Sequence, residues 1–225
     1  GVAAGGDHVF ALKTDGTIWG WGVSSYGRLG LNDAVSRSSP VQIGTLATWS
    51  KVVAGVSSVA ALKTDNTVWS WGRNDSGQLG LGDAVYRSSP VQVGGGGGWR
   101  DLSIAYHTLA LQDPSLLANS QLFAWGRNKY GVLGLGDASG SAPYASRSSP
   151  VQVGTLSIWW QIAQGLDTTL GLKTDGSLWI WGYNDFGQLG TGDAVFRSSP
   201  VQLGGLSTWS RFATAPEIEL VMTTG

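Results

Sequence analysis

One unit of about fifty residues repeats along the chain, and this repetition restricts the possible folds more than any other feature of the sequence. The tripeptide Ser-Ser-Pro occurs four times, always between Arg and Val-Gln, and a Trp follows each Pro after nine positions. A second Trp, followed directly by Gly, and a Gly-x-Leu-Gly turn keep the same register in every copy. We therefore divide the chain into repeats at about 1–48, 49–98, 99–158 and 159–208, with a partial copy at 209–225.

Within one copy, four short segments have the composition of β-strands, at residues 51–54, 59–63, 67–71 and 90–93. The second and third are joined by Thr-Asp-Asn, a hairpin signal because Asn, like the Gly of other copies, accepts a positive φ. Pro at the head of the fourth segment cannot donate a ladder hydrogen bond, which predicts an outer edge strand. A four-stranded unit repeated in series is typical of a β-propeller blade. We expect an all-β fold with four full blades and a partial fifth, forming a single domain or part of one over residues 1–225.

The sequence Trp-Gly-x-Asn-x-x-Gly-Gln-Leu-Gly-x-Gly-Asp at 71–83 and 181–193, followed by the proline segment, resembles the regulator-of-chromosome-condensation (RCC1) repeat. The resemblance covers essentially the whole chain, and the low charge and near-identical copies are similar to bacterial and phage repeat proteins. It implies a propeller, usually of seven blades. Seven copies at this period need roughly 350 residues. We therefore expect further chain or another subunit to complete the ring.

Composition limits the classes of partner and of chemistry. Lys and Arg (14) nearly balance Asp and Glu (15), so no basic field favours nucleic acid. No apolar run reaches the roughly 18 residues of a membrane span, so we expect no membrane insertion. The chain has no Cys, and no His-x-x-x-His motif or acidic cluster occurs. We expect no catalytic residue, no metal and no cofactor, and a protein that is not an enzyme.

Residues that recur in every copy are expected to hold the blade. The two Trp of the third segment are two positions apart, with one small residue between them, so both lie on the same face of the strand. Their position predicts the core between blades. The recurrent Asp and Arg predict an ion pair or a turn cap. The predicted structural residues are Trp21, Trp71, Trp125, Trp181, Asp83, Arg87, Asp193 and Arg197. His8 and His107 occupy the same position of the repeat, which leaves open a structural hydrogen-bonding role or a channel-facing binding role.

Positions that break the repeat are candidates for binding. Aromatic and Arg side chains on loops of a rigid scaffold are typical of recognition surfaces, although rings that merely cover the blade rim are the alternative. The candidate binding residues are Tyr26, Arg73, Tyr86, Arg127, Tyr130, Tyr144, Tyr183, Phe186 and Phe196. The third copy adds insertions at 113–119 and 139–145, and these lengthened loops are a further candidate contact site.

These observations favour a non-enzymatic recognition or structural module whose loops contact a protein or a glycan. A virion fibre or a cell-surface adhesin, and hence an extracellular or virion-surface location, is the setting we expect. The resemblance also implies two alternatives. The first is nucleotide exchange on a small GTPase, although the wedge and basic tail used for it are not evident here. The second is a propeller that inhibits an enzyme through an aromatic face.

Overall fold

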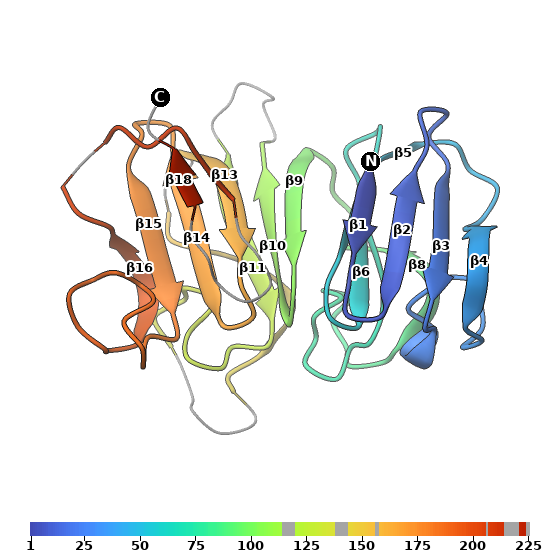
Figure 1. The fold of residues 1–225 in the computed structure, drawn as a ribbon, viewed down its shortest axis with the longest axis horizontal. Coiled ribbons are helices and arrows are strands. Elements are labelled where there is room, and N and C mark those ends of the chain that lie inside the picture. Colours follow the sequence, from blue (N-terminus) through green and yellow to red (C-terminus); the bar gives the residue numbers. More distant parts are fainter. Residues whose placement is uncertain (114–119, 138–143, 156–157, 206, 214–220, 224–225) are drawn as a thin grey trace.

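The computed structural model of the protein describes residues 1–113, 120–137, 144–155, 158–205, 207–213 and 221–223. Four antiparallel four-stranded sheets follow one another along the chain and lie side by side, each with its strands in chain order (Figure 1). The predicted all-β fold of propeller blades is confirmed. No helix within the described residues is long and apolar enough to cross a membrane.

The strands have the following bounds. Blade 1 contains β1 (Val2–Ala4), β2 (His8–Leu12), β3 (Ile18–Gly22) and β4 (Arg37–Gln42), with the short 3-10 helix η1 (Ser25–Gly27) before β4. Blade 2 contains β5 (Trp49–Ala54), β6 (Ser58–Lys63), β7 (Val68–Gly72) and β8 (Arg87–Gln92). Blade 3 contains β9 (Trp99–Ile104), β10 (His107–Gln112), β11 (Gln121–Gly126) and β12 (Arg147–Gln152). Blade 4 contains β13 (Trp159–Gln164), β14 (Thr168–Lys173), β15 (Leu178–Gly182) and β16 (Arg197–Gln202), and β17 (Arg211–Ala213) pairs with β18 (Val221–Thr223).

The outer strand of each blade is longer than the sequence predicted. In blade 2 it begins at Arg87, so Pro90 lies inside β8 and not at its head. Ser70 pairs with Val91 and Gly72 pairs with Arg87, so the register shifts between these two pairs. An irregular edge strand tolerates a residue without an N–H, because the ladder is already interrupted there. The expected boundary was therefore wrong, whereas the expected edge position is correct.

The joints between blades are closed by one buried Trp each. Trp71 of blade 2 is fully buried and packs with Phe10, Ile18 and Leu29 of blade 1. Its Nε1–H donates across the joint to the carbonyl oxygen of Arg28 at 3.0 Å. Burying an indole and satisfying its N–H together stabilise a joint, because a buried unpaired donor costs free energy.

The next two joints repeat this arrangement. Trp125 donates to the carbonyl of Gln78 at 3.1 Å, and Trp181 donates to that of Val132 at 2.8 Å. Trp21 occupies the same column in blade 1, where no described sheet precedes it, and it is only partly buried. The Trp column therefore belongs to the joint and not to the single blade.

The loops leave the blades at two opposite ends. The loops between the first and second strands and between the third and fourth strands of each blade leave at the same end, toward the lower edge of Figure 1, and we call this end the loop face. Residues 113–119 follow β10, whereas residues 139–145 lie between β11 and β12. Because antiparallel strands alternate in direction, β10 and β11 end at opposite ends of blade 3. Residues 114–119 and 138–143 lie outside the described residues.

Candidate functional site

The recurrent Asp and Arg residues are engaged within their own loop. In blade 2, Arg87 Nη2 donates to Asp83 Oδ2 at 2.5 Å, and Asp83 Oδ1 accepts the Val85 N–H at 3.0 Å. Asn74 Nδ2 donates to the same carboxylate at 3.0 Å. The Val85 N–H and Arg87 together hold the pKa of Asp83 below its usual value. Asp193 and Arg197 form the same pair in blade 4. These groups close the loop before the outer strand.

The two histidines are buried among the strands. His107 Nε2 lies 2.9 Å from Thr169 Oγ1 of blade 4, and that hydroxyl donates to the carbonyl of Val132 at 2.7 Å. Since the hydroxyl proton is used there, His107 Nε2 carries the proton and donates. Burial, reinforced by Arg127, lowers the pKa of His107 to about 3. Burial, with Arg28, lowers the pKa of His8 to about 4. Both imidazoles are neutral at pH 7.

The loop face gathers aromatic rings at the joint between blades 1 and 2. Tyr26 of blade 1 meets Tyr86 of blade 2 edge to face, with ring centroids 5.1 Å apart. The Arg73 guanidinium lies 5.4 Å from the Tyr26 ring centre and pairs with Asp75 at 2.5 Å. Both Tyr rings are about half exposed, so three of the candidate binding residues form one surface patch.

A second aromatic cluster lies at the joint between blades 3 and 4. The Tyr130 ring centroid is 4.5 Å from that of Tyr183 and 4.8 Å from that of Phe196. Phe186 meets Tyr183 at 6.1 Å and is 85% exposed. An aromatic ring this exposed on a rigid scaffold is the kind of side chain that interfaces bury.

The joint between blades 2 and 3 is different, because small residues replace the rings. Ser76 and Ser146 occupy the columns of Tyr26 and Tyr86, and they line a hollow of about 430 Å³ together with Tyr144. The Arg127 guanidinium lies 4.8 Å from the ring centre of Tyr106 and 5.2 Å from that of Tyr144. In the part of the chain that the structure describes, the loop face therefore carries two filled joints with an open one between them.

The geometry of the turn explains how Ser76 is held. The Ser76 N–H donates to Gln78 Oε1 at 2.9 Å, and Phe186 makes the same bond to Gln188. The other two turns have Arg or Val in place of Gln, which offer no such acceptor. There Tyr26 and Tyr130 take φ values of 64° and 61° instead. The turns of blades 2 and 4 thus match each other, and those of blades 1 and 3 match each other.

Sequence reasoning missed three residues of this face. Ser76 has a small side chain that does not suggest a binding residue, although the equivalent position differs between copies. Tyr106 lies in the first loop of blade 3, and no other copy has an aromatic there. Arg28 is buried, with its guanidinium 5.8 Å from the Tyr26 ring centre. Comparing equivalent positions of the copies can find these residues in the sequence, if losses of side-chain volume are considered as well as gains.

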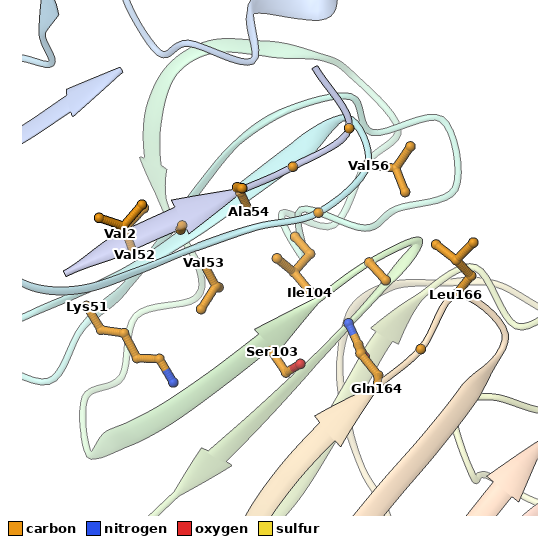
Figure 2. Close-up of a pocket in the computed structure, with 17 residues that line it drawn as sticks. Val2, Lys51, Val52, Val53, Ala54, Val56, Ser103, Ile104, Gln164 and Leu166 are labelled. Carbon is orange, nitrogen blue, oxygen red and sulfur yellow. The ribbon is translucent and has the colours of Figure 1, made fainter. Parts of the chain in front are cut away.

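A second hollow, of about 460 Å³, lies against the inner strands β1, β5, β9 and β13 of the four blades. Figure 2 shows Lys51, Ile104 and Gln164 around it, from β5, β9 and β13. Lys51 pairs with Asp101, and Gln164 Nε2 donates to the carbonyl of His107 at 2.9 Å. Its walls are otherwise mainly aliphatic. Among the described residues, no group of three or more His, Asp or Glu could hold a metal ion.

Four-stranded blades in series, sealed by a Trp of each following blade, define a repeat protein of the β-propeller class. The chain belongs to the family described as "Regulator of chromosome condensation (RCC1) repeat", which matches residues 15–62, 65–111, 119–172 and 175–215. A second description of the same repeat matches residues 1–28, 49–78 and 161–188. The resemblance read from the turn motif is confirmed.

Known proteins share this architecture. The ultraviolet-B receptor UVR8 of Arabidopsis thaliana is 31% identical over 195 residues, which are 85% of this chain and 31% of that protein. The human probable E3 ubiquitin-protein ligase HERC4 is 38% identical over 90 residues, 39% of this chain and 8% of that protein. This chain thus spans less than a third of either relative.

Two solved structures share the fold. Human WBSCR16 has a TM-score of 0.77 at 24% identity, covering 94% of this chain and 56% of that one. Prp20p from Saccharomyces cerevisiae has a TM-score of 0.77 at 20% identity, covering 92% of this chain and 51% of that one.

Proposed function

We propose that this chain is a protein-binding propeller segment that docks its partner on the loop face. The observation that carries the proposal is the open joint between blades 2 and 3, flanked on both sides by aromatic clusters. Its hollow of about 430 Å³ has the volume of a pocket that receives a side chain or a small ligand. A partner ring inserted beside Tyr144 would complete the aromatic row that the chain leaves open.

The chemistry of the surrounding face supports a protein partner. Tyr and Arg dominate it, and these residue types are enriched where protein interfaces concentrate their binding energy. Arg127 lies between Tyr106 and Tyr144, so it adjoins the hollow through the Tyr144 ring, and its Nη1 is 3.8 Å from Asp167 Oδ1. The yeast structure of the same fold is described with its binding properties to Gsp1p and histones. That description concerns Prp20p, and it shows that such a scaffold binds proteins.

The repeat supplies a matched pair of variants to test this. Ser76→Phe installs the residue that the same turn, Asn-Asp-x-Gly-Gln-Leu-Gly, carries in blade 4, so the fold should tolerate it while the ring fills the hollow. Phe186→Ser is the reciprocal change, outside the hollow. Proteins captured by the intact chain would be purified, and their affinity for each variant measured by calorimetry.

We expect Ser76→Phe and Tyr144→Ala each to weaken binding at least about ten-fold, which is the loss typical of interface anchors. Phe186→Ser, which removes an exposed ring of the same face outside the hollow, should weaken binding less than either of these changes. If a partner bound the Ser76→Phe variant as tightly as the original chain, the hollow would not be the docking site. Circular dichroism and melting curves for every variant separate lost binding from lost folding.

The finer proposals drawn from the sequence are tested by further arms of the same experiment. A glycan array tests the glycan and adhesin hypotheses. Nucleotide release from small GTPases tests exchange, and enzyme assays in the presence of the chain test inhibition. Light scattering tests whether a second copy completes the ring. Each remains a proposal that rests on family resemblance or composition.

A further inference from the structure

Two further grooves, away from the loop face, lie at the outer rim of the joints between blades 1 and 2 and between blades 3 and 4. Their volumes are about 430 and 460 Å³. Each is walled by two Trp, a Pro and a Ser of one blade and by the turn and outer strand of the blade before it. Residues at equivalent positions of the repeat line both grooves, so the same groove occurs twice.

A lysine lines each groove with nearly its whole side chain buried. Lys63 is 8% exposed, with its Nζ 3.6 Å from the ring centre of Trp69 and 5.0 Å from that of Trp49. Lys173 is 7% exposed, and its Nζ is 3.5 Å from the ring centre of Trp179. The indole faces fix both ammonium groups at the groove wall by cation–π attraction.

Neither ammonium has an anionic partner in the part of the chain that the structure describes. The Asp of the adjacent hairpin acts on each ammonium electrostatically but lies beyond ion-pair distance from it, and its Oδ1 is engaged in the hairpin turn. Asp65 Oδ1 accepts the Thr67 hydroxyl at 2.6 Å and the Thr67 N–H at 3.0 Å. Asp175 is held in the same way by Ser177. A mostly buried ammonium gains free energy from a carboxylate in contact with it, and among the described residues neither Lys63 nor Lys173 has such a contact.

Blades 1 and 3 show that a ring-held ammonium without a contacting carboxylate is not present in every copy. In blade 1 the equivalent Lys13 forms an ion pair with Asp15 at 2.8 Å and is half exposed. In blade 3, Gln112 stands at the position of the Lys and Phe123 at the position of the Trp, so this position has no cation in that copy. At this position of the repeat, and among the described residues, an ammonium held by a Trp ring without a contacting carboxylate occurs in blades 2 and 4, which line the two rim grooves.

We propose that the two rim grooves bind the acidic side chains of an extended peptide segment from a protein partner. The carboxylate would pair with Lys63 or Lys173, and an apolar neighbour would pack on the Trp and Pro walls. Charge complementarity selects an acidic ligand, and the aliphatic and aromatic walls select a peptide over a free small acid. Two equal grooves two blades apart let one partner engage both, which raises its avidity.

The test follows the indole N–H signals of the intact chain by NMR. The probe is the pentapeptide Ala-Val-Glu-Val-Ala, acetylated and amidated, with its Gln counterpart as the uncharged control. We expect the Glu peptide to shift the signals of Trp69 and Trp179 saturably, at least ten-fold more tightly than the Gln peptide. Trp19 beside the paired Lys13 should not move. Acetylated and amidated Glu alone should bind at least ten-fold more weakly than the pentapeptide.

Two substitutions isolate the charge. Lys63→Met keeps the apolar stem and should abolish the response at Trp69 while leaving that at Trp179. Lys63→Arg retains the cation and should restore at least part of the binding. Equal binding of the Glu and Gln peptides, or an unchanged response in Lys63→Met, would overturn the proposal. If the single amino acid bound as tightly as the pentapeptide, the grooves would be sites for small acids, and the peptide assignment would be wrong.

Discussion

The turns at 77–80 in blade 2 and at 187–190 in blade 4 have the same sequence, Gly-Gln-Leu-Gly, but different neighbours. The φ values agree, at +74° for Gly80 and +66° for Gly190, so the left-handed conformation belongs to the turn itself. A Cβ on Gly80 would lie 2.6 Å from Trp125 Nε1 of the next blade, whereas one on Gly190 would meet only Leu203 Cδ1 at 3.3 Å. The comparison separates two demands on one residue: the turn requires the backbone freedom, and the neighbouring blade requires the missing side chain.

The largest expected effect is at the closed joint. Gly80→Ala should lower the free energy of unfolding by about 3 kcal/mol or more, because positive-φ strain adds to overlap with a packed indole. Gly190→Ala should cost only about 1 kcal/mol, since the strain remains without the overlap. Urea unfolding of both variants measures the difference. Equal losses would show that the joint does not constrain this glycine.

The Trp column gives the next test. Trp125→Phe should cost about 2 kcal/mol, because it leaves a void in the joint and removes one of the two donors to the Gln78 carbonyl, which keeps the Thr108 hydroxyl. Trp21→Phe should cost less than about 1 kcal/mol, because this partly buried side chain has no described blade in front of it. Unfolding curves of the two variants, monitored by circular dichroism, compare them directly. A larger loss at Trp21 would mean that its strand face is covered in solution.

The histidines extend the comparison to pH. His107 and His8 have lowered pKa values, about 3 and about 4, so the native state stays neutral while the unfolded state takes up protons below about pH 6.5. Stability is therefore complete above that pH and falls as the pH drops toward the native pKa values. Each buried histidine should lower the unfolding free energy by roughly 2 kcal/mol between pH 6.5 and 5.

The repeat again supplies the control. His107→Ser introduces the residue that blade 2 has at Ser58, and it should reduce the loss of stability between pH 6.5 and 5 by about half. Both proteins keep the same carboxylates, including Asp167, whose pKa burial raises, so their difference in slope reports His107. Denaturation at several pH values measures the slope. An unchanged slope in His107→Ser would show that this imidazole is protonated in the native state.

The repeat was sufficient to predict the blades, because four landmarks in register fix strand number, hairpin turns and edge strand together. The bounds of the strands could be predicted less well. Strand β8 starts before Pro90, because its pairing with β7 shifts register there. The aromatic loop residues were found because the copies differ at these equivalent positions. Their grouping could not be found that way, because Tyr26 and Tyr86 are sixty residues apart and meet only when two blades pack.

The sequence by itself therefore determined the repeating unit, the family and the residues that vary between copies, since these depend on local pattern and period. Only the tertiary structure decided which of those residues meet, which joint between the described blades stays open at Ser76, and which lysines have no carboxylate in contact with them. Those properties arise where one blade packs against the next. Contacts of that kind depend on side chains from two copies at once, and no single repeat encodes them.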